Sequence, residues 1–306
     1  MTMKSKTRIA AAMALALSAL GANAAITNSN ANFGNSSALF VAMDSATSVS
    51  LVVDLGVSMA DFVGVISGVN ANAGSLSAAN TVASWNFGSN TRTVNGVEVA
   101  GDYAWSSAVS SFFSMAQGGV VWGVIGADNV SGAASGSNTL TNRNLLTTGS
   151  PTDANIVQVS NALTVSNGVG AFQNFVGAQT GTGTHGSNND GASTVTSGAA
   201  FLNTTMRGNF NNSLPWNYLS AVDTTSHLFL VNQQANPVVY QLGAEYGVDA
   251  LLTEGMATFR YDSATNSLNF AAAMAPVPEP ETYAMLVAGL AAVGAVVRRR
   301  SRKQQG

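Results

Sequence analysis

The hydrophobic residues early in the chain alternate with polar ones, which is the period of a β-strand. The alternation is clearest at 48–55, and a second apolar run, ALFVAM, precedes it at 38–43. The residues between them, DSAT at 44–47, favour a turn. These segments predict an early β-hairpin. The apolar residues that share one face of its second strand are Val49, Leu51, Val53 and Leu55.

Strand-like patterns return later in the chain. In the segment VVWGVI, the side chains of Val120, Trp122 and Val124 share one face, which predicts a strand at 120–125. The other predicted strands are 227–231, 237–242 and the two arms of a second hairpin, 256–261 and 267–270, around the turn SATN.

Helical spacing appears first at 103–117. Gly118 and Gly119 follow this segment and supply a C-terminal stop. The spacing therefore predicts a helix over 103–117. The apolar residues that recur there are Trp105, Ala108, Val109, Phe112 and Ala116.

A second helical region is predicted from Pro151 onward, where Thr152 or Asp153 can cap the first turn. We expect this helix to break at Asn167-Gly168 and a second short helix to follow at 171–178. The residues that share one face of the first helix are Ile156, Val159, Ala162 and Leu163.

Residues 177–198 consist almost wholly of Gly, Thr, Ser, Asn, Asp and Ala. So few apolar side chains cannot pack a core, and we expect a surface loop or disorder there. The whole pattern predicts a mainly β fold with a few inserted helices, either β-sandwich-like or α+β.

The charge of the body, taken as residues 25–276, restricts its partners. This segment contains four arginines, no lysine and thirteen acidic residues, a net charge of −9. Such a surface cannot neutralise many phosphates, which argues against nucleic acid. The chain also has no cysteine, which excludes cysteine nucleophiles, thiolate metal sites and iron–sulfur clusters.

Short motifs provide no catalytic site. The segment GTGTHG at 181–186 has the spacing of a dinucleotide-binding loop, but its polar flanks lack the strand and the helix that such a loop requires. His185 and His227 are the only histidines and do not have metal-ligand spacing, and no G-x-S-x-G sequence is present. We therefore predict no serine triad and no catalytic zinc site.

Calcium is the cofactor for which the sequence has the most suitable ligands. Asn188, Asn189 and Asp190 offer oxygen donors on a glycine-rich segment. Neither a helix–loop–helix calcium pattern nor a repeated Gly-Asp nonapeptide accompanies them. A solvated loop explains these residues better, and we expect no cofactor and no metal.

Two functions that involve glycans depend on residue types alone. A pair of carboxylates can hydrolyse a glycosidic bond, and exposed tryptophans can stack on sugars. The candidate carboxylates are Glu98, Asp102, Glu245, Asp249 and Glu254. The candidate tryptophans are Trp85, Trp105, Trp122 and Trp216. No pattern selects among these residues, so surface acids and core aromatics are the simpler interpretation, and we predict no enzymatic activity.

The N-terminal residues have the three parts of an export signal. A basic segment with Lys4, Lys6 and Arg8 precedes an apolar run at 9–20. Ala22-Asn23-Ala24 then supplies the small residues, Ala22 and Ala24, that signal peptidase accepts. We predict that residues 1–24 are a signal peptide that is removed.

The C-terminal segment 277–306 predicts a short membrane span. Its apolar run, 283–297, makes a helix of about 22 Å, whereas the hydrocarbon core of a bilayer is about 30 Å thick. The arginines that follow stop transfer at the cytoplasmic side. We therefore expect a single C-terminal transmembrane helix that holds the precursor transiently. The residues that flank it are Pro278, Glu279 and Pro280 before the span and Arg298, Arg299 and Arg300 after it.

This order of Pro-Glu-Pro, short apolar helix and terminal arginines resembles the PEP-CTERM sorting domain of exported Gram-negative proteins. The resemblance implies that an exosortase, a membrane cysteine transpeptidase, cuts near Pro278-Glu279-Pro280. It further implies that a precursor held in the inner membrane becomes a cell-surface or extracellular protein. The organisms concerned make exopolysaccharide and form biofilm.

We therefore expect an exported surface or matrix protein with a structural or interaction role. Its expected processing partners are signal peptidase and exosortase, its membrane contact is transient, and its body associates with exopolysaccharide or with copies of itself. A carbohydrate-binding adhesin is the alternative, and a secreted glycan-active hydrolase is a less favoured one.

Overall fold

A computed structural model gives the conformation of most of the body. The residues it describes are 26, 36–44, 46–62, 76, 80–129, 143–149, 162–185, 190–202, 219–232, 238–241 and 257–272. The chain divides into two compact units, Met1–Ala273 and Met274–Gly306, and every described residue lies in the first. The predicted signal peptide and the predicted C-terminal transmembrane helix lie outside the described residues.

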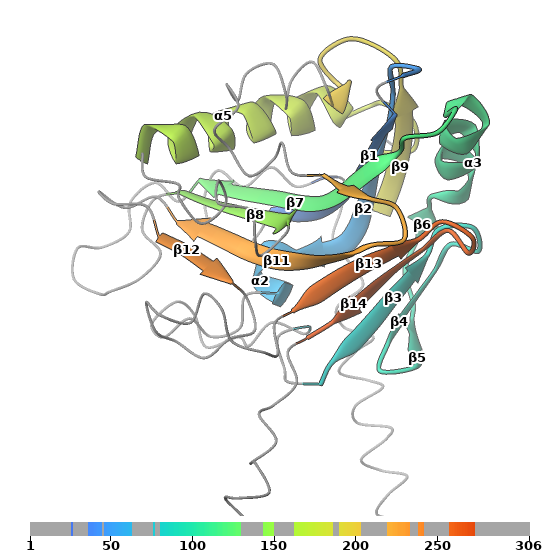
Figure 1. Ribbon diagram of the computed structural model, residues 1–306, viewed down its shortest axis with the longest axis horizontal. Helices are drawn as coiled ribbons and strands as arrows, with labels where there is room; N and C mark the ends of the chain where they lie inside the picture. The colour runs from blue at the N-terminus through green and yellow to red at the C-terminus, as the bar shows by residue number, and fades with distance from the viewer. Residues whose placement is uncertain are drawn as a thin grey trace, which may run out of the picture. The chain divides into compact units, whose positions relative to one another are not determined.

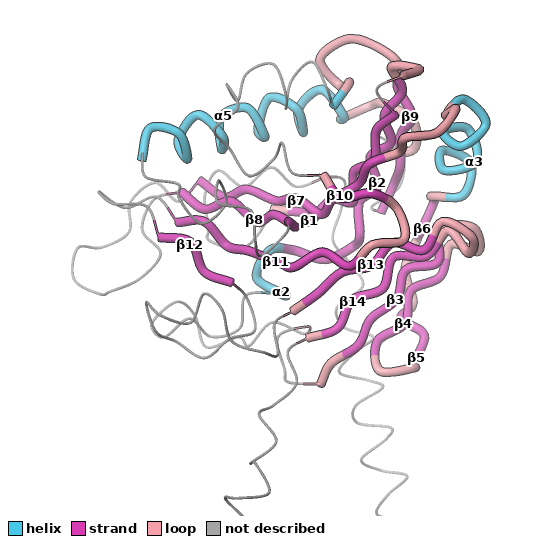
Figure 2. The backbone as a smooth tube through the Cα atoms, viewed as in Figure 1, coloured by secondary structure: helices cyan, strands magenta, loops and turns pink. Residues whose placement is uncertain are grey.

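Strands dominate the described part of the chain (Figures 1 and 2). They are β1 (Ser37–Asp44), β2 (Val49–Ser58), β3 (Val82–Asn86), β4 (Thr91–Val94), β5 (Val97–Val99), β6 (Tyr103–Ala104), β7 (Val121–Asn129), β8 (Arg143–Gly149), β9 (Asp190–Val195), β10 (Ser220–Ala221), β11 (Thr225–Asn232), β12 (Val238–Gln241), β13 (Thr258–Asp262) and β14 (Ser267–Ala271). The helices are α2 (Met59–Phe62), α3 (Ser106–Met115) and α5 (Ala162–Gln179). The prediction of a mainly β fold with inserted helices is confirmed.

All fourteen strands belong to one sheet, with the order β5-β4-β3-β14-β13-β11-β8-β7-β1-β2-β9-β6. β10 and β12 lie off this path and pair with β7 and β11. Neighbouring strands in this order pair antiparallel except β6, which pairs with β9 in parallel. The described strands thus form a single curled sheet, a half-barrel, and not two separate sheets (Figure 1).

The two ends of the strand order are neighbours in the sequence. β5 ends at Val99 and β6 begins at Tyr103, so only residues 100–102 connect them. A connection this short cannot cross a wide flat sheet. The sheet must therefore curl until its first and last strands approach each other.

The early hairpin is confirmed. β1 and β2 pair antiparallel from Asp44↔Val49 onward, and the turn contains Ser48 with a φ of 53°. The Asp44 carboxylate stabilises this turn by accepting a hydrogen bond of 2.8 Å from the Ala46 backbone N–H. Every residue of β1 is buried, because each face of the sheet is covered at this point.

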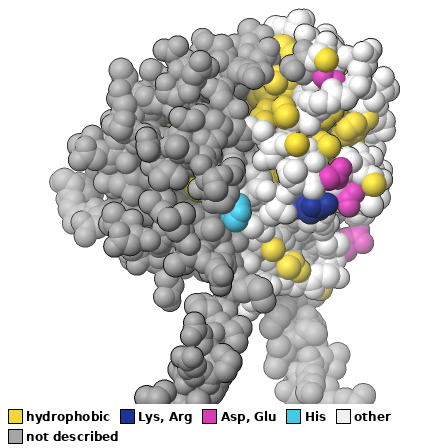
Figure 3. Space-filling model, viewed as in Figure 1, with side chains coloured by type: hydrophobic (Ala, Val, Ile, Leu, Met, Phe, Trp, Pro, Cys, Tyr) yellow, Lys and Arg dark blue, Asp and Glu magenta, His cyan; other side chains and the backbone are white. Residues whose placement is uncertain are grey.

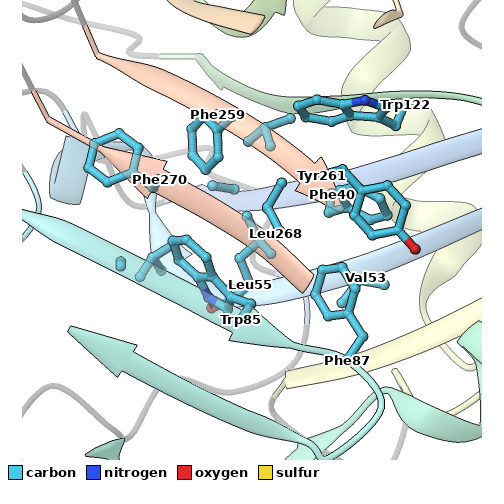
Figure 4. Packing of buried hydrophobic residues seen from close by; sticks show 14 of the residues in the cluster. Phe40, Val53, Leu55, Trp85, Phe87, Trp122, Phe259, Tyr261, Leu268 and Phe270 are labelled. Atoms are coloured by element: carbon cyan, nitrogen blue, oxygen red, sulfur yellow. Dashed lines mark hydrogen bonds between the residues drawn. The ribbon is translucent and has the colours of Figure 1, made fainter. Parts of the chain in front are cut away.

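The core on the inner face of the curl is aromatic (Figure 4). The ring centroid of Phe40 on β1 lies 5.0 Å from those of Phe87 and Tyr261. The rings of Trp85 and Phe259 lie 6.1 Å apart. Since these residues come from β1, β3, β13 and the turn after β3, the inner core joins strands that do not pair with each other. Large aromatic side chains supply most of the burial that such a core needs.

The outer face is covered by α5, which packs against β7 and β8. The helix runs without interruption from Ala162 to Gln179, so the predicted break at Asn167-Gly168 is wrong. Gly168 is buried, and burial of the helix on the sheet outweighs the low helix propensity of Asn and Gly. The start predicted at Pro151 lies outside the described residues. The buried apolar residues of α5 are Val169, Ala171, Phe172, Phe175 and Val176.

The expectation of a surface loop or disorder at 177–198 is wrong for the end of α5 and for β9, whereas 180–185 and 196–198 are turns and bends and 186–189 lie outside the described residues. α5 extends to Gln179, and β9 pairs with β2 from Ser50↔Val195 to Val53↔Ala192. Side-chain hydroxyls secure this strand to the rest of the fold. Thr194 Oγ1 donates to the Ala108 carbonyl at 2.6 Å, and the Ala192 N–H donates to Thr184 Oγ1 at 2.7 Å. Backbone pairing and hydroxyl contacts therefore replace the apolar burial that the segment lacks.

The remaining predicted elements match the structure closely. α3 begins after Trp105 and ends before Gly118 and Gly119, whose φ angles of 119° and 77° end the helix. β7, β11, β12 and the β13–β14 hairpin occupy the segments predicted as strands. β3, β4, β5 and β8 were not predicted, because their sequences are polar and short.

We predict that Phe172→Ala destabilises the protein by about 3–5 kcal/mol, because it leaves a cavity between α5 and the sheet. Asn174→Ala, on the exposed side of the same helix, should change stability by no more than about 0.5 kcal/mol. Urea unfolding of both variants measures the difference. Equal midpoints would show that α5 does not pack as described.

Candidate functional site

β2 changes its bonding partner halfway along its length. β9 pairs with β2 only from Ser50 to Val53. The backbone carbonyl groups of the next three residues of β2, 54–56, accept hydrogen bonds from side chains. We call this line of contacts the seam. The hydrogen bonds of the seam are Trp105 Nε1 to Asp54 O (3.0 Å), Trp85 Nε1 to Leu55 O (2.7 Å) and Arg92 Nη1 to Gly56 O (3.0 Å).

The backbone of β2 bulges at the seam. The register with β1 shifts between Ser37 and Leu39, and Gly56 adopts a φ of +64°. This conformation favours glycine. A Cβ atom at Gly56 would also lie 2.9 Å from Oδ1 of Asp190. Glycine at position 56 is therefore what allows the Asp190 carboxyl group to approach the bulge.

Two carboxyl groups are buried beside this bulge. Asp54 is 2% exposed and Asp190 is 7% exposed. The Asp54 carboxyl accepts hydrogen bonds of 3.0 Å from the Gly56 N–H and from the Ser37 hydroxyl. The two aspartates are 136 positions apart in sequence and meet only because β9 pairs with β2.

Burial decides the protonation of this pair. Burial raises the pKa of Asp54 to about 8, and the negative charge of Asp190 raises it further. The hydrogen bonds from Gly56 and Ser37 act in the opposite direction and lower it. Burial also raises the pKa of Asp190 to about 6, although the Arg92 guanidinium lowers it. At neutral pH the pair thus carries about one negative charge, which the charge of Arg92 balances.

Arg92 is the cation of the seam. It is almost fully buried and its guanidinium carbon lies 5.7 Å from the centre of the Trp85 ring, a cation–π distance. Its charge also lowers the pKa of Tyr103, which burial raises. The Nε atom of Arg92 has no hydrogen-bond partner among the described residues. The side chain is therefore held by Gly56 and Trp85, and its charge acts on Asp190 and Tyr103.

The structure places two of the candidate carboxylates, Glu98 and Asp102, at the exposed margin of the seam. The charge of Asp102 raises the pKa of Asp190, and the charge of Glu98 raises the pKa of Tyr103, so both lie near the cluster. Their side chains are exposed. The other three candidates, Glu245, Asp249 and Glu254, lie outside the described residues.

The arrangement suits a structural role for the buried pair. A glycosidase requires an acid and a second carboxylate that face a substrate in a cleft. Asp54 and Asp190 are instead closed off by the bulge, by Arg92 and by the indoles of the seam. Among the described residues on the face drawn in Figure 3, few side chains are charged, and a basic side chain lies beside acidic ones.

A second buried polar cluster lies between α5 and β9. The Ser193 hydroxyl donates to Gln179 Oε1 at 2.7 Å, and Gln179 Nε2 donates to the Ala200 carbonyl at 2.8 Å. His185 is buried nearby, and neither ring nitrogen has a hydrogen-bond partner within the described ranges. Burial lowers the pKa of His185 to about 4, and the neighbouring Val52 backbone opposes this shift only in part.

The rejected dinucleotide motif has the wrong surroundings in the structure as well. Residues 181–185 form turns between the end of α5 and β9, whereas a dinucleotide loop runs from a strand into a helix. Of the calcium candidates, Asn188 and Asn189 lie outside the described residues, and Asp190 belongs to the seam. In the described ranges, no group of three or more acidic, histidine or cysteine side chains is placed to hold a metal ion.

Three of the four tryptophans belong to the core. Trp85, Trp105 and Trp122 are fully buried, and each indole donates a hydrogen bond to a backbone carbonyl. These three side chains cannot present a stacking surface to a sugar. Trp216 lies outside the described residues.

The sorting residues of the tail also lie outside the described residues, and the comparison with protein families provides the evidence for them. Residues 276–301 match the model of the PEP-CTERM protein-sorting motif. This range contains Pro278, Glu279 and Pro280 and the arginines at 298–300. The comparisons with curated proteins and with solved structures found no match.

The match identifies the tail. The tail is a sorting signal of the PEP-CTERM type, as its sequence resemblance indicated. The protein is thus targeted to an exosortase for export and sorting toward the cell surface or the extracellular space. In the part of the chain that the structure describes, no helix is long and apolar enough to cross a membrane.

We predict that Asp54→Asn flattens the pH dependence of stability. The pKa of Asp54 rises from 3.8 to about 8 on folding, so the native state holds a proton that the unfolded state releases between these values. The wild-type protein should therefore lose stability as the pH rises from about 4 to about 8, and the variant should lose less. Thermal unfolding across this range measures the slope.

Glu98→Gln is the matched control, because it also replaces a carboxyl group by an amide but on an exposed strand. It should keep the wild-type slope. If Asp54→Asn also kept that slope, the carboxyl group of Asp54 would not be buried in its protonated form.

Proposed function

We propose that this chain is an exosortase-processed protein of the cell surface or extracellular matrix. Its body has a structural or interaction role in association with exopolysaccharide. The observation that carries the proposal is the sorting motif at 276–301. The predicted signal peptide at 1–24 supplies the export that this motif requires. In this proposal Pro278-Glu279-Pro280 is the cutting region, and the arginines at 298–300 hold the end of the tail in the cytoplasm.

The body supports a scaffold role more than an enzymatic one. Its buried acidic pair is used within the seam, where Arg92 balances its charge. Its aromatic side chains fill the inner core, and the sheet is closed by side-chain hydrogen bonds. An acidic body without lysine, residues 25–276, fits a hydrated polysaccharide matrix, because neutral hydroxyl groups bind it without charge pairing.

A carbohydrate-binding adhesin is the second candidate function. Since Trp85, Trp105 and Trp122 are in the core, such an adhesin has to bind sugars through Trp216, which lies outside the described residues, or through other groups. The half-buried Tyr103, between Arg92 and the exposed Asp102, is the described aromatic residue best placed for this purpose. A glycan array with purified mature protein distinguishes the two functions, because specific binding favours the adhesin.

We predict that deletion of Pro278–Gly306 changes the location of the protein. The truncated chain should no longer reach the cell surface through the exosortase, and its distribution between cells, surface and medium should shift strongly. Deletion of Gln304–Gly306 is the matched control, because it leaves the matched range 276–301 intact. Fractionation with immunodetection measures both chains. An unchanged distribution of the longer deletion would refute the sorting role.

The association with exopolysaccharide needs its own test. In the natural host, the mature protein should sediment with the extracellular matrix, and most of it should be lost to the medium in a strain that makes no exopolysaccharide. Equal retention in both strains would argue for self-association or for another anchor.

A further inference from the structure

One end of the sheet lies close in sequence to the sorting tail, and we call it the rim. Its residues are Thr81, Val82, Asn95, Gly96, Val97 and Ala272. We propose that the rim is the surface on which the membrane-bound exosortase docks while it cuts the tail. This inference rests on the proposed function and adds to it a surface on the folded body.

The pairing of the strands brings the rim together. Ala271 on β14 lies opposite Val82 on β3, and Val94 at the end of β4 lies opposite Val97 on β5. Backbone hydrogen bonds of 2.8 Å join Ala272 N–H to the Thr81 carbonyl and Asn95 N–H to the Val82 carbonyl. The end of β14 is therefore fixed to the same edge as the β4–β5 turn.

The length of the chain limits how far the cutting region extends from this edge. Ala272 is held by its hydrogen bond to Thr81, and Pro278 follows after only five residues, 273–277. A fully extended segment of this length spans at most roughly 20 Å. An enzyme with its catalytic groups at Pro278-Glu279-Pro280 must therefore work close to a folded sheet. β14 cannot easily peel away, because it is paired with β13 on one side and β3 on the other.

The chemistry of the rim suits a protein partner. Val82 is 50% exposed and Val97 is 47% exposed, and they are two of the three large exposed hydrophobic residues in the described part of the chain. The Asn95-Gly96 turn between them, with φ angles of 50° and 77°, projects no long side chain. A lipid surface is less suitable, because anionic headgroups attract basic segments and the body carries a net charge of −9.

The test is the rate at which the full-length precursor is converted to mature protein in its natural host. Val82→Asp and Val97→Asp, alone and together, should slow this conversion several-fold in a pulse–chase experiment. Met115→Asp is the matched control, because Met115 is the third large exposed hydrophobic residue and lies on α3, which packs against β2 and β9. It should leave the rate unchanged. Thermal unfolding of each mature variant checks that the body still folds.

A longer connection provides a second arm. Ten Gly and Ser residues inserted between Met274 and Ala275 leave the matched range intact and free the cutting region from the rim. In this background the Val82→Asp and Val97→Asp substitutions should no longer affect the rate. The proposal would be overturned if the double variant without the insertion were converted at the wild-type rate. It would also be overturned if Met115→Asp slowed conversion as much as the rim substitutions.

Two further controls separate this inference from the proposed function and from lipid binding. Replacement of Pro278-Glu279-Pro280 by alanines should block conversion; normal conversion of that variant would reject the sorting function itself. If the alanine variant were not converted but the rim variants were converted at the wild-type rate, only the docking surface would be rejected. Binding of the mature protein to vesicles of anionic and zwitterionic lipids, lost on Val82→Asp, would assign the rim to the membrane and overturn the proposal.

Discussion

Closure of the sheet depends on three carbonyl groups of β2, those of residues 54–56, which accept hydrogen bonds from the side chains of Trp105, Trp85 and Arg92. Buried carbonyl groups must find donors, and the indoles of Trp85 and Trp105 provide them while their rings fill the inner core. Arg92 provides the third donor and brings a charge into the seam. The seam therefore joins the backbone of β2, near one end of the strand order, to side chains of β3 and β4, near the other end. The connection at 100–102 keeps these two ends of the sheet together.

The acidic pair follows from this arrangement. A buried guanidinium requires a nearby negative charge, and Asp190 provides it. Asp54 instead forms hydrogen bonds with the bulge and remains protonated at neutral pH, so the seam contains one ion of each sign. With no cysteine in the chain, this network, the aromatic core and the packing of α5 provide what disulfides provide in other exported proteins. The fold therefore explains the buried acids of the described residues, Asp44, Asp54 and Asp190.

Local patterns were sufficient to predict the β1–β2 and β13–β14 hairpins, α3 and the sorting tail, because each is encoded by consecutive residues. β9 was missed because its stability comes from pairing with β2 and from Thr184 and Thr194, and no apolar period marks such a strand. The continuity of α5 was also missed, because it depends on the packing of the helix on the sheet at Gly168 and not on local helix propensity. The Asp54–Asp190 pair has no local signal beyond an aspartate within a strand, because the partners come from distant parts of the chain. The inner core could not be predicted for the same reason, because its rings, drawn in Figure 4, come from strands that are far apart in the sequence, such as β1, β3 and β13.

The position of β14 has a consequence for the time at which the fold is completed. β14 is the last described strand of the chain, yet it lies between β3 and β13 in the sheet. Until it arrives, the β3–β4–β5 meander has no strand that connects it to β13 and the rest of the sheet. A chain that crosses a membrane from its N-terminus exposes β14 only after nearly all of the body has been exported. In such a chain, completion of the sheet and arrival of the sorting tail at the membrane would be consecutive events.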